Sequence, residues 1–104
     1  MRPPALSVSH PVIREVVRLA AVEAPGVVRV GRAGPPWRRL VAGRPVQVRL
    51  RDGIVAVKVV VVARPGHSLP ALAADVRTAV GGAIERLLGL ALRDVTVVVD
   101  GVGG

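Results

Sequence analysis

The feature that most constrains the fold is a helix pattern that passes through one glycine into a strand pattern, between residues 69 and 99. Its apolar residues recur at three- and four-residue steps, as on one buried face of an amphipathic helix: Leu69, Leu72, Ala73, Val76, Val80, Ala83, Ile84 and Leu87. Gly89 follows where a left-handed C-cap is needed, because glycine adopts a positive φ without a Cβ clash. Leu90 and Leu92 then lead into the β-branched run 95–99, which predicts a final strand.

The rest of the chain predicts one more helix and four more strands. Ser9 as N-cap and Pro11 in the first turn favour the start of a helix, and Pro25 with Gly26 favours its end. Ser68 is in turn a candidate N-cap for the last helix. The expected elements are a strand over Ala5, Leu6, Ser7 and Val8, a helix over 9–24, strands over 27–30, 46–51 and 54–63, the helix over 68–88 and the strand over 95–99.

This succession predicts an α+β fold with the order β-α-β-β-β-α-β. We expect a two-layer sandwich in which two helices pack on one face of a mixed sheet. A chain of 104 residues has room for one hydrophobic core, so we expect a single domain over residues 1–104, with its core over 5–102. Residues 31–45 are rich in glycine, proline and arginine and predict an irregular loop.

The hairpin defines the two faces of the sheet. Asp52-Gly53 is a strong two-residue turn signal, which places Leu50 opposite Val55, Val48 opposite Val57 and Val46 opposite Val59 on the helix-covered face. The opposite face is expected to carry Gln47, Arg49, Arg51, Lys58, Ile54, Val60, Val62 and Val98. That face is too apolar for open water, so we expect partial cover from a second copy, from the loop around Trp37 or from a protein partner. The alternative is that these are ordinary surface valines of a strand.

Composition excludes several classes of protein. With no cysteine, the chain has no disulfide, thiolate metal site or cysteine nucleophile, and this suits the cytoplasm. No apolar run reaches the about 18 residues of a membrane span, because Lys58 interrupts the longest run and Arg64 ends it. The net charge of +8 fits phosphates of nucleic acid or anionic lipid headgroups, or a coding bias toward arginine.

The sequence offers no convincing catalytic or ligand site. His67, Ser68 and Asp75 are the residue types of a hydrolase triad, but no G-x-S-x-G motif accompanies them. His10 has no second histidine at metal spacing, and no cofactor, metal or catalytic residue is predicted. Gly81-Gly82 in the last helix favours a close approach of the two helices over a phosphate loop.

The order of these motifs resembles the alkaline-shock, or envelope stress response, family of small bacterial proteins from Gram-positive lineages. The resemblance runs from about Leu6 to Val102. It rests on Val12-Ile13, Val16-Val17, Ala20-Ala21, Gly26-Val27, Gly66, Leu72-Ala73, Val76-Arg77, Val80, Gly89-Leu90 and the alternating Val95, Val97 and Val99. The resemblance implies a non-enzymatic, cytoplasmic protein that gathers at the membrane through a membrane-anchored partner and supports envelope homeostasis.

Two functions from different classes follow from these observations. The first is a protein-interaction or scaffolding module that engages itself, as a homo-oligomer, or a related membrane-anchored protein. Its contact residues would be Ile54, Val60, Val62, Val98, Trp37, Arg49 and Arg51. The alternative is a nucleic-acid-binding module that uses Arg38, Arg39, Arg49, Arg51 and Lys58. Trp37 could also stack on a base, enter a membrane interface or fold back over an apolar edge. Binding to phosphates would weaken steeply with salt, whereas binding through an apolar surface would not.

Overall fold

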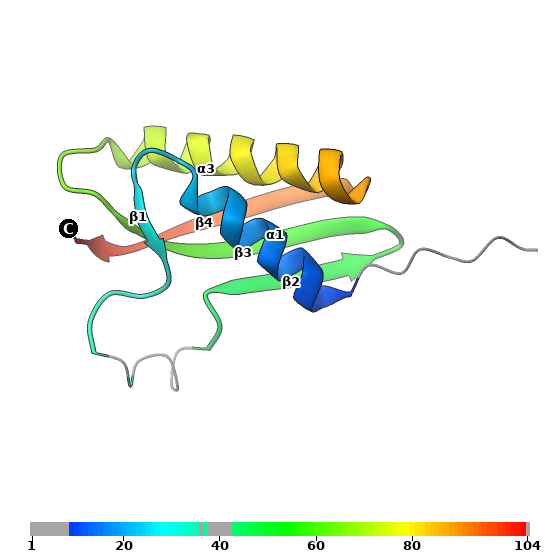
Figure 1. Cartoon of the computed structure of the whole chain (residues 1–104), viewed down its shortest axis with the longest axis horizontal. Coiled ribbons are helices and arrows are strands. Elements are labelled where there is room, and N and C mark those ends of the chain that lie inside the picture. The colour runs from blue at the N-terminus through cyan, green and yellow to red at the C-terminus, as the bar shows by residue number, and fades with distance from the viewer. Residues whose placement is uncertain (1–8, 36, 38–42, 104) are drawn as a thin grey trace, which may run out of the picture.

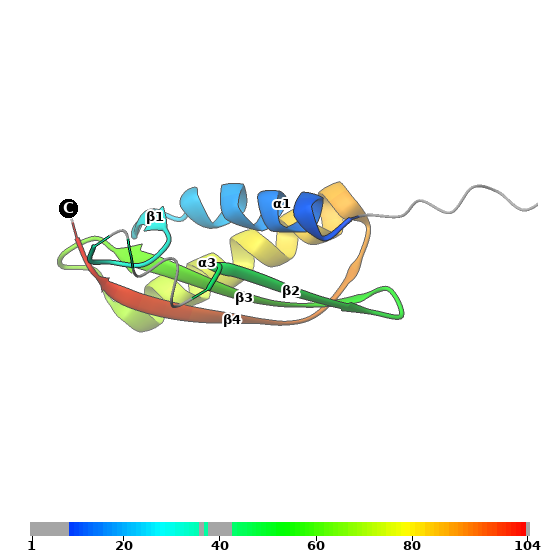
Figure 2. The same cartoon turned by 90° about the horizontal axis from the view of Figure 1, so that it is seen from below.

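The structure is a computed structural model, and it describes residues 9–35, 37 and 43–103. A twisted four-stranded sheet forms one layer and two helices form the other; α1 lies above the sheet in Figure 2, and α3 runs along β4 in Figure 1. The elements are α1 (His10–Val22), β1 (Val27–Val30), β2 (Val46–Arg51), β3 (Ile54–Ala63), α3 (Leu69–Ala83), the π-helical turn η1 (Ile84–Leu88) and β4 (Ala91–Val102).

The α+β class and the two layers are confirmed, but the expected order of elements is not. The described chain runs α-β-β-β-α-β, whereas the sequence predicted an opening strand before α1. That strand was placed over Ala5–Val8, which lies outside the described residues. The sheet of the described residues is built without it, because β3 has partners on both of its edges.

The longest central strand, β3, organises the sheet. On one edge it pairs antiparallel with β2 and then with β1, which lie end to end along it, and on the other edge it pairs parallel with β4. The sheet is therefore mixed, as predicted. The hairpin register is also confirmed, with Leu50 opposite Val55 and Val46 opposite Val59. Asp52 and Gly53 have φ angles of 53° and 75°, which are the two positive values that a type I′ turn requires.

The hydrophobic core lies between the sheet and the helices. Ile13 and Val17 of α1 and Leu72, Val76 and Val80 of α3 are buried against the inner face of the sheet. The prolines stand in the first turn of each helix, where a missing N–H breaks no bond. The two expected caps differ. The Ser68 hydroxyl accepts a hydrogen bond from the Ala71 N–H at 3.4 Å, whereas Ser9 occupies the N-cap position without a side-chain bond.

The second helix ends differently from its sequence pattern. The turn η1 is π-helical, so each residue advances by a smaller angle than in an α-helix. Leu87, which was predicted on the buried face, is therefore 69% exposed, and that prediction is wrong. Gly89 then ends the helix with φ 63° and ψ 23°, which confirms the predicted left-handed cap.

The glycines of the last helix do not serve a helix–helix contact, which corrects that prediction. A Cβ on Gly81 would lie 3.2 Å from Leu92 Cδ2 of β4, and the atoms nearest to a Cβ on Gly82 would be those of the guanidinium group of Arg86, in the same helical segment. The tight approach occurs at Gly26 instead. A Cβ there would lie 2.9 Å from Leu72 Cδ1 and 3.0 Å from His67 Nδ1. Gly26 thus lets the turn after α1 pack against the start of α3.

Candidate interaction surface

The face of the sheet that points away from the helices, here called the outer face, carries the predicted interaction residues. The register aligns it in rungs across the three strands: Arg51 with Ile54, Arg49 with Ala56 and Asp94, Gln47 with Lys58 and Thr96, and Val60 with Val98. The neighbouring residues Val95, Val97 and Val99 pack into the core, which assigns Asp94, Thr96 and Val98 of β4 to the outer face.

One end of the outer face is covered by the chain itself. Val60 and Val62 are each 1% exposed although they lie on the side opposite the helices. The N–H of Gly31 donates to Val60 O at 2.9 Å, and the N–H of Val60 donates to Pro45 O at 2.8 Å. A Cβ on Gly103 would lie 3.3 Å from Val62 Cγ1. Both ends of the 31–45 segment and the C-terminal end of β4 therefore converge here.

An ion pair joins the two covering segments. Arg32 Nη1 lies 3.4 Å from Asp100 Oδ2, and the two side chains are only 15% and 19% exposed. Ala33 Cβ lies 2.8 Å from the position that a Cβ of Gly101 would take. The covers expected from the sequence for the outer face were a second copy, the chain's own loop or a protein partner. At this end the beginning of the chain's own loop provides the cover. Val60 and Val62 are buried within the chain, so the prediction that they contact another molecule is wrong for these two residues. Val98 is half-buried.

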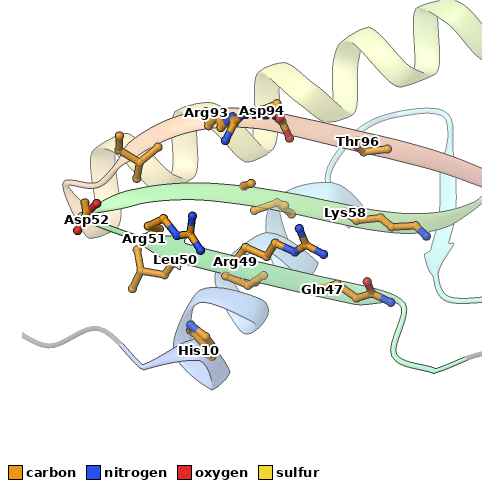
Figure 3. Close-up of a pocket in the computed structure, with 14 residues that line it drawn as sticks. His10, Gln47, Arg49, Leu50, Arg51, Asp52, Lys58, Arg93, Asp94 and Thr96 are labelled. Carbon is orange, nitrogen blue, oxygen red and sulfur yellow. Dashed lines mark ion pairs between the residues drawn. The ribbon is translucent and has the colours of Figure 1, made fainter.

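The other end of the outer face is open and basic. Arg49, Arg51 and Lys58 are exposed there, and Ile54 is 46% exposed beside the hairpin turn. Within the described part of the chain none of these three cations forms an ion pair, while Arg93 lies 4.0 Å from its neighbour Asp94. Figure 3 shows the long side chains of Gln47, Arg49, Arg51 and Lys58 along β2 and β3.

A groove of about 840 Å³ follows β2 at this open end. Side chains from both faces of β2 line it: Arg49 and Arg51 from the outer face, and the half-buried Val48 and Leu50 from the inner face. His10, at the start of α1, forms its far wall, below β2 in Figure 3. The groove thus begins at the edge of β2 and extends across the open end of the outer face, where Lys58 of β3 and Asp94 and Thr96 of β4 also line it.

The two edges of the sheet differ in what lies beside them. α3 runs beside β4, and Arg77 of this helix donates from Nε to Val95 O of β4 at 3.2 Å. No strand among the described residues pairs with the outer edge of β2. Pro45 O accepts from Val60 N, so the alternation of an antiparallel pair directs the backbone groups of residues 45, 47, 49 and 51 toward β3. The N–H and C=O groups of Val48 and Leu50 therefore face the groove.

Trp37 is not among the residues that line the groove. Trp37 is 61% exposed, so it does not bury itself against an apolar edge of the sheet. Arg38 and Arg39, which were proposed with it for nucleic acid, lie outside the described residues. The predicted site groups Trp37 with the sheet residues and omits several residues that line the groove. Among the omitted residues is His10, whose only signal in the sequence is its place at the start of a predicted helix.

The residues considered for a hydrolase triad do not form one. Ser68 caps α3, His67 packs near Gly26, and Asp75 is exposed on α3. No group of three His, Cys, Asp or Glu residues in the described ranges could hold a metal ion. None of the helices within those ranges is long and apolar enough to cross a membrane. Away from the groove, a hydrogen bond from Arg18 lowers the pKa of Glu15 on the exposed side of α1.

Comparison with known proteins identifies structures with the same fold and the family of this chain. Three solved structures of MamM-CTD share the fold. A double variant has a TM-score of 0.59 and 15% sequence identity, and the match covers 90% of this chain and 95% of that chain. A single variant has a TM-score of 0.58 and 16% identity with 89% and 99% coverage, and a nickel form has a TM-score of 0.56 and 14% identity with 88% and 96% coverage. At such low identity the likeness shows the fold alone. No curated protein matches the chain. A family model does match residues 4–103, almost the whole chain. This chain therefore belongs to the alkaline shock protein 23 family, which has a cell envelope-related function.

Proposed function

We propose that this protein is a non-catalytic protein-interaction module within the cell envelope-related function of its family, and that it engages its partner through the open end of the outer face and the edge of β2. The observation that carries the proposal is the outer edge of β2, with which no strand of the described residues pairs. Open strand edges invite pairing with another chain, and proteins usually block them with helices, charges or loops. Within the described ranges, α3 lies beside β4 and donates a hydrogen bond to it, whereas no strand or helix pairs with the outer edge of β2 beside the groove.

The surroundings of β2 support a role in binding. The apolar residues Val60 and Val62 at the far end of the outer face are already covered, so the exposed surface narrows to one end of the sheet. That end combines an apolar contact, Ile54, with three cations that form no ion pair among the described residues, and the two acids Asp52 and Asp94 leave it with an excess of positive charge. An added strand obtains affinity from backbone hydrogen bonds and specificity from such alternating side chains. The proposal includes a partner at the membrane, either a membrane-anchored relative or a second copy of this chain.

Site-specific photo-crosslinking in cells tests the proposal. A photoreactive amino acid in place of Gln47 on β2 should give an adduct of one defined mass, and the same group in place of Asp75 on α3 is the matched exposed control. We expect the Gln47 adduct in the membrane fraction, at the mass of the chain plus its partner or at twice the mass of the chain. Equal labelling from both positions, or none from Gln47, contradicts the proposal.

The cations at the open end favour a second candidate, a nucleic-acid-binding module. Arg49, Arg51 and Lys58 lie on adjacent strands and could contact successive phosphates. The outer face carries no aromatic side chain on which a base could stack, which weighs against this function. Binding of a labelled 20-nucleotide single strand should fall steeply between 50 and 200 mM salt if the phosphates are the ligand, so the affinity at two salt concentrations decides between the candidates.

A further inference from the structure

The side chains that line the groove along β2 indicate which kind of segment could bind there. A strand laid against β2 alternates its side chains between the two faces of the sheet. On the outer side these side chains would meet Arg49 and Arg51, with Lys58 one strand further. On the inner side they would meet the half-buried Val48 and Leu50, next to His10. The two walls of the groove therefore favour opposite kinds of residue at alternate positions.

The backbone of β2 is ready for such an addition. Val48 and Leu50 direct their N–H and C=O groups into the groove, since the odd-numbered residues of β2 bond to β3. Backbone groups that face a partner in this way give affinity to any extended chain, whatever its sequence. Selection must then come from the side chains, and the charges that lie nearest to an added strand are those of Arg49 and Arg51, which form no ion pair among the described residues.

A second copy of this chain fits the groove poorly. Two β2 strands paired about a two-fold axis would place Arg49 and Arg51 of one copy against Gln47, Arg49 and Arg51 of the other, and like charges opposite one another are destabilising. No other segment of the chain supplies the complementary pattern. Its acidic residues stand at 15, 23, 52, 75, 85, 94 and 100, and no two of them are two positions apart.

We propose that the β2 groove binds an extended segment of a different protein in which acidic residues alternate with apolar ones. The acidic side chains contact Arg49 and Arg51, and the apolar side chains cover Val48 and Leu50. The segment adds a strand to the open edge of the sheet. This inference rests on the proposed function, because it names the partner chemistry of that same surface.

Synthetic peptides test this partner chemistry on the full-length chain. The probe is a fluorescent seven-residue peptide that alternates glutamate with valine, followed by anisotropy. Its control is a peptide of the same composition with the glutamates in one block. We expect the alternating peptide to bind at least about tenfold more tightly than the block peptide, because only alternation satisfies both walls. Methylation of the backbone nitrogens that face β2 should abolish binding. Equal binding of the two peptides overturns strand addition.

Charge reversal supplies the decisive control. The double variant Arg49→Glu/Arg51→Glu should lose binding of the glutamate peptide and gain binding of a peptide that alternates lysine with valine. Arg86→Glu, an exposed charge reversal on η1, should change neither. Circular dichroism of each variant checks that it is folded. If the double variant keeps the glutamate peptide, or fails to accept the lysine peptide, the contact assigned to Arg49 and Arg51 is wrong.

Three further outcomes separate this inference from the function on which it rests. Binding of the chain to vesicles of anionic phosphatidylglycerol, without binding of either peptide, would assign the basic end to a lipid surface and overturn the inference. Failure of the peptides with persistent crosslinks from Gln47 would overturn the partner chemistry alone. Failure of both peptides and crosslinks would overturn the proposed function as well.

Discussion

The two ends of β3 carry outward-facing residues at the same spacing, yet they meet opposite environments. Ile54 at the hairpin end is 46% exposed, whereas Val62 at the other end is 1% exposed. The strand pattern is the same at both ends, and the difference comes from what crosses the outer face. Residues 31–33 and 100–103 meet over one end, held by Arg32 and Asp100, and no described segment covers the other. One end of the face is therefore part of the fold, and the other is available for binding.

The strongest way to break this comparison is to place a charge at each end. Val60→Asp buries a carboxylate without a partner, and we expect it to lower the free energy of unfolding by about 4 kcal/mol or more. Lys58→Asp, two residues away on the same face, stays in water and should change it by less than about 0.5 kcal/mol. Urea denaturation followed by circular dichroism measures both. Similar losses for the two variants would mean that the ends do not differ.

The next test concerns the ion pair that closes the covered end. In a double-mutant cycle with Arg32→Gln and Asp100→Asn we expect a coupling energy of about 1–2 kcal/mol, because both side chains are shielded from water. The exposed pair of Arg18 and Glu15 is the matched control, and solvent should reduce its coupling well below that value. Urea denaturation of the single and double variants gives the cycle. Equal coupling in the two pairs would show that Arg32 and Asp100 do not hold the cover.

Local signals account for the parts of the fold that were predicted correctly. Asp52-Gly53 requires a type I′ turn, and that turn determines every pair of the β2–β3 register and hence the two faces. Gly89 and Ser68 were correctly placed at helix ends because capping depends on a few neighbouring residues. Leu87 failed because a π-helical turn changes the angle per residue, and the apolar spacing does not reveal such a turn.

For the candidate site, the sequence predicts which residues share a face of the sheet but not which of them are exposed. Strand alternation placed Ile54, Arg49, Arg51, Val60 and Val62 on one face, and the register agrees. Their exposure depends on contacts between residues far apart in the chain, such as the pair of Arg32 and Asp100, which are 68 positions apart. No periodicity in β3 reports whether such a cover exists. The free edge of β2 and the groove with His10 likewise emerge only when α1 is packed onto the sheet.

A smaller effect is expected at the hairpin turn, which holds the open end together. Gly53 has a φ of 75°, and a Cβ there would meet nothing within 4 Å, so Gly53→Ala adds backbone strain without a clash. We expect a loss of about 1 kcal/mol in the free energy of unfolding. Thr96→Ala, on the outer face at the same end, should cost less than about 0.5 kcal/mol. Thermal and urea denaturation measure both, and an unchanged Gly53→Ala would show that the open end does not rely on its turn.

The smallest effect should come from the residues on which the proposed binding depends most. Arg49 and Arg51 form no ion pair within the described residues and lie two positions apart on one exposed face. Their charges repel each other and add to a chain of net charge +8. Arg49→Gln/Arg51→Gln should therefore leave the free energy of unfolding within about 0.5 kcal/mol of the native value, or raise it slightly at low salt. A larger loss, measured by urea denaturation at two salt concentrations, would mean that these arginines hold the sheet together. An unchanged stability would show that the fold does not need this pair of cations, which is the result that the proposed binding role requires.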